Sequence, residues 1–570
     1  MPSAHFKRPR EAVASYACVF EVQQIVCGEF ASLSQASHSR EYRYCWKLNA
    51  FILHTTDLHH VVSYQQRIQI IDGILNCLGY HPVSQSYQHG QFAEMLVECG
   101  AIHALCLQLG FVANKISSGE TEELQGILTL IHLLCQCDEK VIEQPLDEIG
   151  SDLYDLMVRV LKKSQNDEKK NEKIIQSILY TWHLLASHAE RSIKMLTCQG
   201  LVGALVYILR RETVHVDVNI EAIGIVKHLT YFAENYRVHL LDYPDLIPSL
   251  SRLTFTNMHE ISIERLSAIF RNLACTTQAR KGMVTQSIIL AALVQLSKGT
   301  SRRTTRNLLF TLGSLAMEPD SAMPMILFGE GMLVTVLVMF LGANEDETTR
   351  RQAARALRLL ARDKAAALLS RIHPLLDRLS DVALYDSSQS VRLDATEAFA
   401  NCAAYIRSPM PNHDSILASL AQLSSGPAPD AVAKALKEQA TVPVNRPRMA
   451  ESVDLLSALA KLALRDHTSN ISKEHVANVL LQLSNDEGNR EKMVTEQVLT
   501  SLVKTCQQNG IREIAVLSLL NLASVESNRK GMASHFGLLR SLVQFVASNS
   551  PSPSLKNDVK KTIVMLVPLL

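Results

Sequence analysis

The stretch NLACTTQARKGM, from Asn272 to Met283, returns 249 residues later as NLASVESNRKGM, from Asn521 to Met532. Weaker copies of this phrase are QLSNDEGNREKM, EQATVPVNRPRM and LLASHAERSIKM, which end at Met493, Met449 and Met195. A phrase that recurs in this way marks a repeat protein, in which each unit buries its apolar surface against its neighbours. The chain is therefore expected to be a stack of similar units.

The second residue of the phrase, called the anchor below, gives the period of the repeat. Nine anchors follow one another at spacings of 37 to 45 residues: Leu185, Leu229, Leu273, Leu315, Leu360, Cys402, Gln439, Leu483 and Leu522. Six anchors have a methionine ten positions later, at Met195, Met283, Met325, Met449, Met493 and Met532. This methionine stripe is interpreted as shared core, because an unbranched thioether fills irregular gaps between stacked units.

Each unit has the sequence pattern of three helices. A long helix such as GIREIAVLSLLNLAS is followed by a brief one such as NRKGMASHFG and then by one such as LLRSLVQFVAS. The apolar residues recur at three and four positions, which is the period of a helix and not of a strand. Hydrophobic residues make up 47% of the chain and aromatic residues 5%, which suits helices packed through leucine and alanine. Gly100, Gly200 and Gly537 each follow a methionine by five residues and are expected to stop the brief helix.

This pattern resembles the armadillo repeat, which importin-alpha and beta-catenin share. The resemblance implies an all-α fold, a right-handed superhelical solenoid of about ten to twelve three-helix repeats. Phased repeats are predicted over residues 174–548 and divergent armadillo-like repeats over 61–173. Residues 1–60 are predicted to form an irregular or atypical helical segment, and residues 549–570 a capping helix.

Two irregularities and one apolar stretch need separate interpretations. SQNDEKKNE, residues 164–172, predicts a charged loop, and the 37-residue spacing near LSSGPAPD, residues 423–430, predicts a distorted unit. Residues 323–343 are long enough to cross a bilayer but contain Pro324, Gly329 and Gly331. These breakers favour two buried helices separated by a turn, so no membrane insertion is expected.

Charge and cysteine usage limit the classes of function. The net charge is +1, so no overall field would attract nucleic acid or an anionic membrane, and no nucleic-acid partner is predicted. Twelve scattered cysteines and an opening without an apolar leader suggest a reducing compartment. KRPR, from Lys7 to Arg10, matches a minimal nuclear signal or a solvated arm. The cytoplasm is therefore expected, with the nucleus as the alternative.

The sequence predicts no catalytic residue, no metal and no cofactor. It lacks the nucleophile, phosphate-loop, zinc and dinucleotide motifs, so the chain is not expected to be an enzyme. His and Cys residues gather in the N-terminal quarter, at His54, His59, His60, Cys77, Cys99, Cys106, His132, Cys135 and Cys137. Zinc needs four converging ligands, whereas Cys135 and Cys137 should point to different faces of a helix. Buried thiols and ordinary polar histidines are therefore favoured.

The long helices are expected to carry the function. In armadillo proteins they line a concave groove that holds an extended peptide. Residues one, five and nine positions before each anchor should share one face, because four-residue steps stay on one side of a helix. The candidate partner-binding residues on this face are Asn272, Arg306, Phe310, Arg351, Arg355, Asn401, Glu474, Glu513 and Asn521. The resemblance implies that the three asparagines bond the main chain of a bound peptide.

The charge along this face is polarised. Arg306, Arg351 and Arg355 make its middle basic, and Glu474 and Glu513 make its C-terminal part acidic. These charges are either merely solvated or they recognise an acidic or phosphorylated extended segment of a protein partner. The predicted function is a non-enzymatic scaffold or adaptor. The alternatives are a nucleocytoplasmic transport receptor, which the missing Trp ladder of importin-alpha disfavours, a small-GTPase regulator, or a structural subunit of a large cytoskeletal assembly.

Overall fold

The computed structural model consists of helices, and no strand occurs among the residues it describes. These are residues 101–113, 121–137, 139–164, 168–211, 216–256, 258–299, 301–406, 413–466, 468–548 and 552–569, with isolated positions before residue 101. The chain divides into two compact units, unit 1 over residues 1–279 and unit 2 over residues 280–570. The all-α prediction is confirmed, and the predicted segment 1–60 lies outside the described residues.

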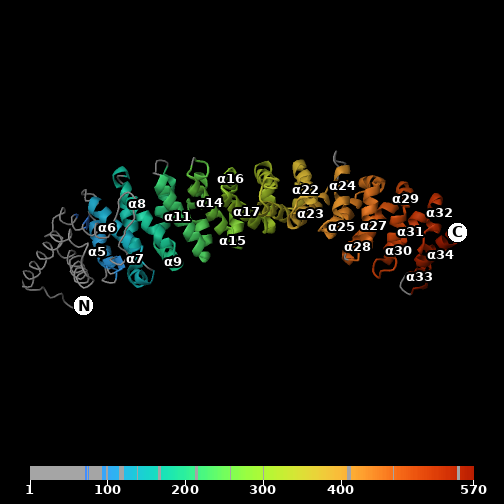
Figure 1. Cartoon of the computed structure of the whole chain (residues 1–570), viewed down its shortest axis with the longest axis horizontal. Helices are drawn as coiled ribbons and strands as arrows, with labels where there is room; N and C mark the ends of the chain where they lie inside the picture. The colour runs from blue at the N-terminus through green and yellow to red at the C-terminus, as the bar shows by residue number, and fades with distance from the viewer. Residues whose placement is uncertain are drawn as a thin grey trace, which may run out of the picture. The chain divides into compact units, whose positions relative to one another are not determined.

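The long helices that end at the anchors form in both units (Figure 1). Unit 1 contains α8 (Glu168–Ala186), α11 (Val216–Phe232) and α14 (Glu260–Leu273). Unit 2 contains α17 (Arg302–Ala316), α20 (Glu347–Leu360), α23 (Gln389–Ala403), α25 (Pro429–Ala440), α28 (Asn470–Asn485) and α31 (Arg512–Ala523). Within each unit every long helix packs on the next one. All nine anchors are fully buried, so the predicted phase of the repeat is correct.

Brief and second helices connect the long ones. The brief helices are α9 (Ala189–Thr197), α12 (Arg237–Asp242), α15 (Thr277–Thr285), α18 (Ala322–Leu327), α21 (Asp363–Leu369), α26 (Arg446–Glu451), α29 (Glu487–Met493) and α32 (Glu526–Ser534). The second helices are α10 (Leu201–Arg210), α13 (Leu246–Leu253), α16 (Ser287–Leu296), α19 (Met332–Met339), α22 (His373–Tyr385), α24 (His413–Leu423), α27 (Val453–Leu464), α30 (Glu496–Thr505) and α33 (Leu538–Ala547). All six methionines of the stripe are fully buried, which confirms their core role.

Further helices lie before and after this series. Helices α5 (Ala101–Val112), α6 (Thr121–Leu134) and α7 (Glu139–Ser164) precede α8, and α34 (Pro553–Leu566) packs on α31, α32 and α33 at the C-terminal end. The predicted charged loop is shorter than expected, because α7 continues to Ser164 and α8 already begins at Glu168. Gly200 and Gly537 have φ of 93° and 81°, so each supplies the left-handed turn that starts a second helix.

The apolar stretch 323–343 forms α18 and α19, which are separated by a turn that contains Gly329 and Gly331. Within the described residues no single helix is both long and apolar enough to cross a membrane. Two bent pairs reach the required length and composition together: Ala189–Thr197 with Leu201–Arg210, bent by 89°, and Pro319–Glu330 with Met332–Met339, bent by 94°.

An Asn–Arg pair inside the repeated phrase caps the long helix that precedes it. Asn528 Nδ2 donates to the carbonyl of Leu522 at 3.0 Å, and Arg529 Nε donates to the carbonyl of Ala523 at 3.0 Å. The pairs Asn489–Arg490 and Asn445–Arg446 bond the ends of α28 and α25 in the same way. The last carbonyls of a helix have no partner within it, so this pair satisfies groups that would otherwise be unpaired.

The 37-residue spacing corresponds to a repeat in which no brief helix is described between α23 and α24. There Gln439 replaces the usual anchor leucine, and its Nε2 donates to the carbonyls of Ala403 and Ile406. Its Oε1 accepts from Asn445 Nδ2 at 2.6 Å and lies 3.1 Å from His413 Nε2. Gln439 therefore caps α23 as the Asn–Arg pair does elsewhere, which explains a polar anchor in the core.

Candidate peptide-binding face

The three predicted columns of residues differ in exposure along unit 2. Residues nine positions before the anchors are all exposed, and they are Arg306, Arg351, Leu393, Asp430, Glu474 and Glu513. Residues five positions before are exposed or half-buried, whereas Ser314 and Leu359, one position before, are buried. The accessible part of the face is therefore the N-terminal half of the long helices, since exposure falls toward the anchors.

Helices α17 and α20, which pack on each other, carry seven arginines between them. Arg302, Arg350 and Arg358 each form an ion pair, with Asp346 at 3.4 Å, Asp386 at 2.7 Å and Asp394 at 2.7 Å. The predicted residues Arg306, Arg351 and Arg355 are exposed. Within the described part of the chain, their guanidiniums form no hydrogen bond or ion pair. These three, called the basic face below, are therefore the arginines most open to a ligand.

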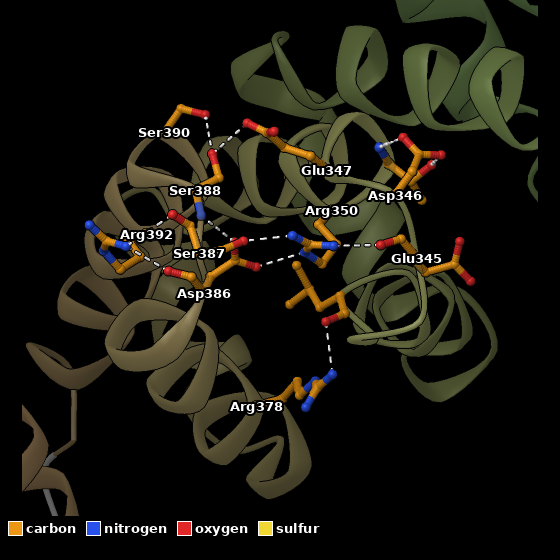
Figure 2. A network of polar contacts seen from close by, with 12 residues as sticks. Glu345, Asp346, Glu347, Arg350, Arg378, Asp386, Ser387, Ser388, Ser390 and Arg392 are labelled. Atoms are coloured by element: carbon orange, nitrogen blue, oxygen red, sulfur yellow. Dashed lines mark hydrogen bonds and ion pairs between the residues drawn. The ribbon is translucent and has the colours of Figure 1, made fainter.

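A partly buried ion pair fixes the start of α20 against the turn before α23 (Figure 2). Arg350 Nε and Nη2 donate to the two carboxylate oxygens of Asp386 at 2.7 and 3.2 Å. Burial alone would raise the pKa of Asp386, but hydrogen bonds from Arg350 and from the Ser388 N–H outweigh it and hold that pKa below its usual value. Arg392 Nη1 also donates to the Asp386 carbonyl at 2.6 Å. This network positions α20, the helix that carries Arg351 and Arg355.

The predicted asparagines lie in different environments. Asn272 is buried, and its Nδ2 donates to the Lys227 carbonyl and to Thr230 Oγ1, each at 3.3 Å. Asn521 Nδ2 donates to Ser484 Oγ at 3.1 Å and to Asn485 Oδ1 at 2.9 Å. Both amides therefore tie neighbouring long helices together, and contact with a partner would require them to exchange these bonds. Asn401 is half-buried and, among the described residues, its amide has no hydrogen-bond partner.

The remaining predicted residues are accessible. Glu474 and Glu513 are exposed near the starts of α28 and α31, and Phe310 on α17 is 37% exposed. Asp430, at the corresponding position of α25, differs because its carboxylate accepts hydrogen bonds from Ser469 and Ser472. The structure thus places the basic residues on α17 and α20, which pack on each other. The acidic residues lie on α28 and α31, which also pack on each other but lie further along the series. Their contact with a partner stays a prediction.

In unit 1, a polar cluster that sequence reasoning missed spans three successive long helices. His183 Nδ1 of α8 contacts the carboxylate of Glu221 on α11, whose other oxygen lies 3.6 Å from Arg265 Nη1 of α14. His228 lies beside His183, with ring centroids 5.2 Å apart. Burial lowers the pKa of His228 to about 4, with help from nearby Lys227, so this imidazole is neutral at neutral pH. The sequence feature that could have indicated this cluster is Gly224, a glycine in the middle of α11, where a side chain would meet Arg265 and His183.

Gly224→Ala should destabilise unit 1, although alanine normally stabilises a helix interior by about 0.5–1 kcal/mol over glycine. A Cβ at residue 224 would lie 2.5 Å from Arg265 Nη1 and 2.9 Å from two ring atoms of His183, so the cluster must move. Gly313→Ala on α17 is the matched control, since its Cβ would meet nothing within 4 Å. Thermal unfolding should show a loss for the first variant and a small gain for the second. A gain in both would contradict the packing described for Gly224.

The N-terminal cysteines and histidines do not assemble into a metal site in the part that the structure describes. Cys106, Cys135 and Cys137 are buried, and burial raises the thiol pKa of Cys135 and of Cys137 to about 12. No group of three or more His, Cys, Asp or Glu residues that could hold a metal occurs among the described residues. His54, His59, His60, Cys77 and Cys99 lie outside them.

Comparison with solved structures identifies the fold. A structure from work on a conserved phosphorylation switch that controls the interaction between cadherin and beta-catenin aligns with a TM-score of 0.52 and 14% identity, over 88% of this chain and 99% of that one. Computationally designed armadillo repeat proteins for modular peptide recognition align with a TM-score of 0.36 and 19% identity, over 44% of this chain and 99% of that one. No protein-family model and no curated protein matches the sequence. The chain has the armadillo-type fold, as the repeat pattern predicted.

Proposed function

We propose that this chain is a non-enzymatic scaffold that holds an extended, acidic or phosphorylated segment of a protein partner along the long helices of unit 2. The observation that carries the proposal is the basic face. Among the residues that the structure describes, Arg306, Arg351 and Arg355 remain exposed and form no ion pair, while three neighbouring arginines bind carboxylates. A guanidinium is always charged and binds a carboxylate or a phosphate through two parallel hydrogen bonds. Three of them on two packed helices suit a segment with several negative groups.

The direction of the segment follows from the second charged region. Glu474 and Glu513 are exposed on α28 and α31, further along the same series of long helices. A segment whose acidic part lies on the basic face would direct a basic or neutral part toward these carboxylates. The five-before positions of unit 2 contain no tryptophan, so recognition of the importin-alpha type is disfavoured.

The fold supports a role in binding other proteins. One solved structure with a similar fold comes from work on a phosphorylation switch that controls the interaction between cadherin and beta-catenin. The sequence carries no motif for nucleophilic, phosphoryl-transfer or zinc chemistry, which agrees with a non-enzymatic role. We propose that the protein acts in the cytoplasm, with the nucleus as the alternative.

A labelled oligoglutamate peptide should bind the full chain more tightly than an uncharged glycine–serine peptide of equal length. Its affinity should fall several-fold as salt rises, because charges at a surface are screened over about 8 Å at physiological ionic strength. A phosphoserine peptide should behave like oligoglutamate. Fluorescence anisotropy at low and high salt measures both effects. Equal binding of the charged and uncharged peptides at low salt would contradict the proposed function.

A further inference from the structure

Two carboxylates on α23 border the basic face. Arg358, one turn beyond Arg355 on α20, places its Nε 2.7 Å from Asp394 Oδ1 and donates from Nη1 to Glu397 Oε2 at 3.1 Å. The Asp394 side chain is 13% exposed, whereas Arg358 and Glu397 are about one-third exposed, at 32% and 33%. This triad links the neighbouring long helices α20 and α23, and it pairs an arginine that would otherwise add to the positive charge of the basic face.

Asp394 also acts on two of the arginines that remain open. Asp394 interacts favourably with the charges of Arg351 and Arg355 as well as with that of Arg358, whereas the Glu397 carboxylate repels the Asp394 carboxylate. Burial raises the pKa of Asp394 above its usual value, and the three arginines only partly offset that effect. The negative charge of Asp394 therefore reduces the positive potential at Arg351 and Arg355, where the partner's own carboxylates or phosphates would bind.

We propose that Asp394 and Glu397 are built-in competitors of the partner, which limit how tightly the basic face holds an anionic segment. Both carboxylates bind Arg358, and Asp394 also opposes the charge of Arg351 and Arg355. This inference rests on the proposed function. The two carboxylates also determine where the partner lies, because they repel its negative groups from the α23 side. The anionic part of the segment therefore lies over Arg306, Arg351 and Arg355, between α17 and α20. Segments with few negative charges are held weakly, which makes the face selective for dense acidic or phosphorylated stretches.

Isosteric neutralisation tests the competition. The double variant Asp394→Asn, Glu397→Gln keeps the shape of both side chains and removes their charges, so oligoglutamate should bind it several-fold more tightly than the wild type. Arg358→Gln should act in the opposite direction, because it removes a cation and leaves both carboxylates uncompensated. Asp454→Asn, a neutralisation of an exposed carboxylate on the second helix α27, is the control and should leave the affinity unchanged. Circular dichroism and thermal unfolding verify that each variant is folded.

The signs of these changes separate the possible outcomes. If Asp394 and Glu397 only positioned Arg358, the double variant and Arg358→Gln would both weaken binding, and the competitor role would be wrong. An unchanged affinity of the folded double variant would also overturn it, while leaving the proposed function intact as long as the wild type binds oligoglutamate in a salt-dependent way. Absence of such binding by the wild type would refute the proposed function, and this inference with it.

Discussion

Arg350→Ala should destabilise unit 2 far more than Arg302→Ala, although both replacements remove an arginine that is paired with an aspartate. The side chains of Arg350 and Asp386 are 13% and 5% exposed, so removing the arginine leaves a buried carboxylate without its counter-charge. The loss of hydrogen bonds to a charged group in such a partly buried site costs about 1.5–3 kcal/mol. The Arg302 side chain is 80% exposed and its pair with Asp346 is long, so its removal should cost about 0–1 kcal/mol. Urea unfolding followed by circular dichroism measures both variants, and equal midpoints would contradict the burial argument.

The penalty for losing Arg350 should depend on pH. Because the pKa of Asp386 is held below its usual value in the folded chain, its ionised form contributes stability above the unfolded pKa of about 3.9. That stability is lost as pH falls through the lower folded pKa. The difference between wild type and Arg350→Ala should therefore be largest near neutral pH and shrink in acid. A difference that grows on acidification would show that the Asp386 carboxylate is not stabilised in this way.

The repeat was predictable from sequence because its signal is periodic. The anchors and the methionine stripe recur at a nearly constant spacing, and a residue that recurs with the repeat is buried in every unit, as Leu522 and Met532 show. Gln439 occupies a buried anchor position although it is polar, because its amide donates hydrogen bonds to the buried carbonyls of Ala403 and Ile406. Periodicity alone thus predicted which residues form the core, but it did not explain why the anchor at residue 439 is a glutamine.

The pairing of the arginines could not be predicted from the columns. Asp386 and Asp394 lie 36 residues after Arg350 and Arg358, respectively, on the next repeat, and the pairing depends on how α20 packs against the helices of that repeat. For the same reason, the columns did not show that Asn272 and Asn521 already bond neighbouring helices. Sequence patterns gave the face on which side chains lie, whereas contacts between repeats decide which of them are open to a ligand.

The most direct test of the binding proposal is charge reversal on the basic face. The triple variant Arg306→Glu, Arg351→Glu, Arg355→Glu should lose binding of oligoglutamate and of a phosphoserine peptide. Each charged hydrogen bond contributes about 1.5–3 kcal/mol once the bound segment excludes water from it. Three such losses correspond to a weakening of roughly a thousandfold or more. Its thermal stability should fall only modestly, since the three side chains are exposed and, among the described residues, make no ion pair. The modest loss is expected because Asp394 no longer has the favourable charges of Arg351 and Arg355 nearby.

A second triple reversal controls for net charge. Lys281, Lys364 and Lys530 are exposed residues of unit 2 that lie on the brief helices α15, α21 and α32 and not on the long helices. Reversing all three to Glu gives the same change in net charge as the triple variant of the basic face. The decisive measurement is the anisotropy titration of oligoglutamate against wild type and both folded variants at low salt. The proposal predicts that binding disappears only in the Arg306, Arg351 and Arg355 variant, whereas binding that survives in it would show that the basic face is merely solvated.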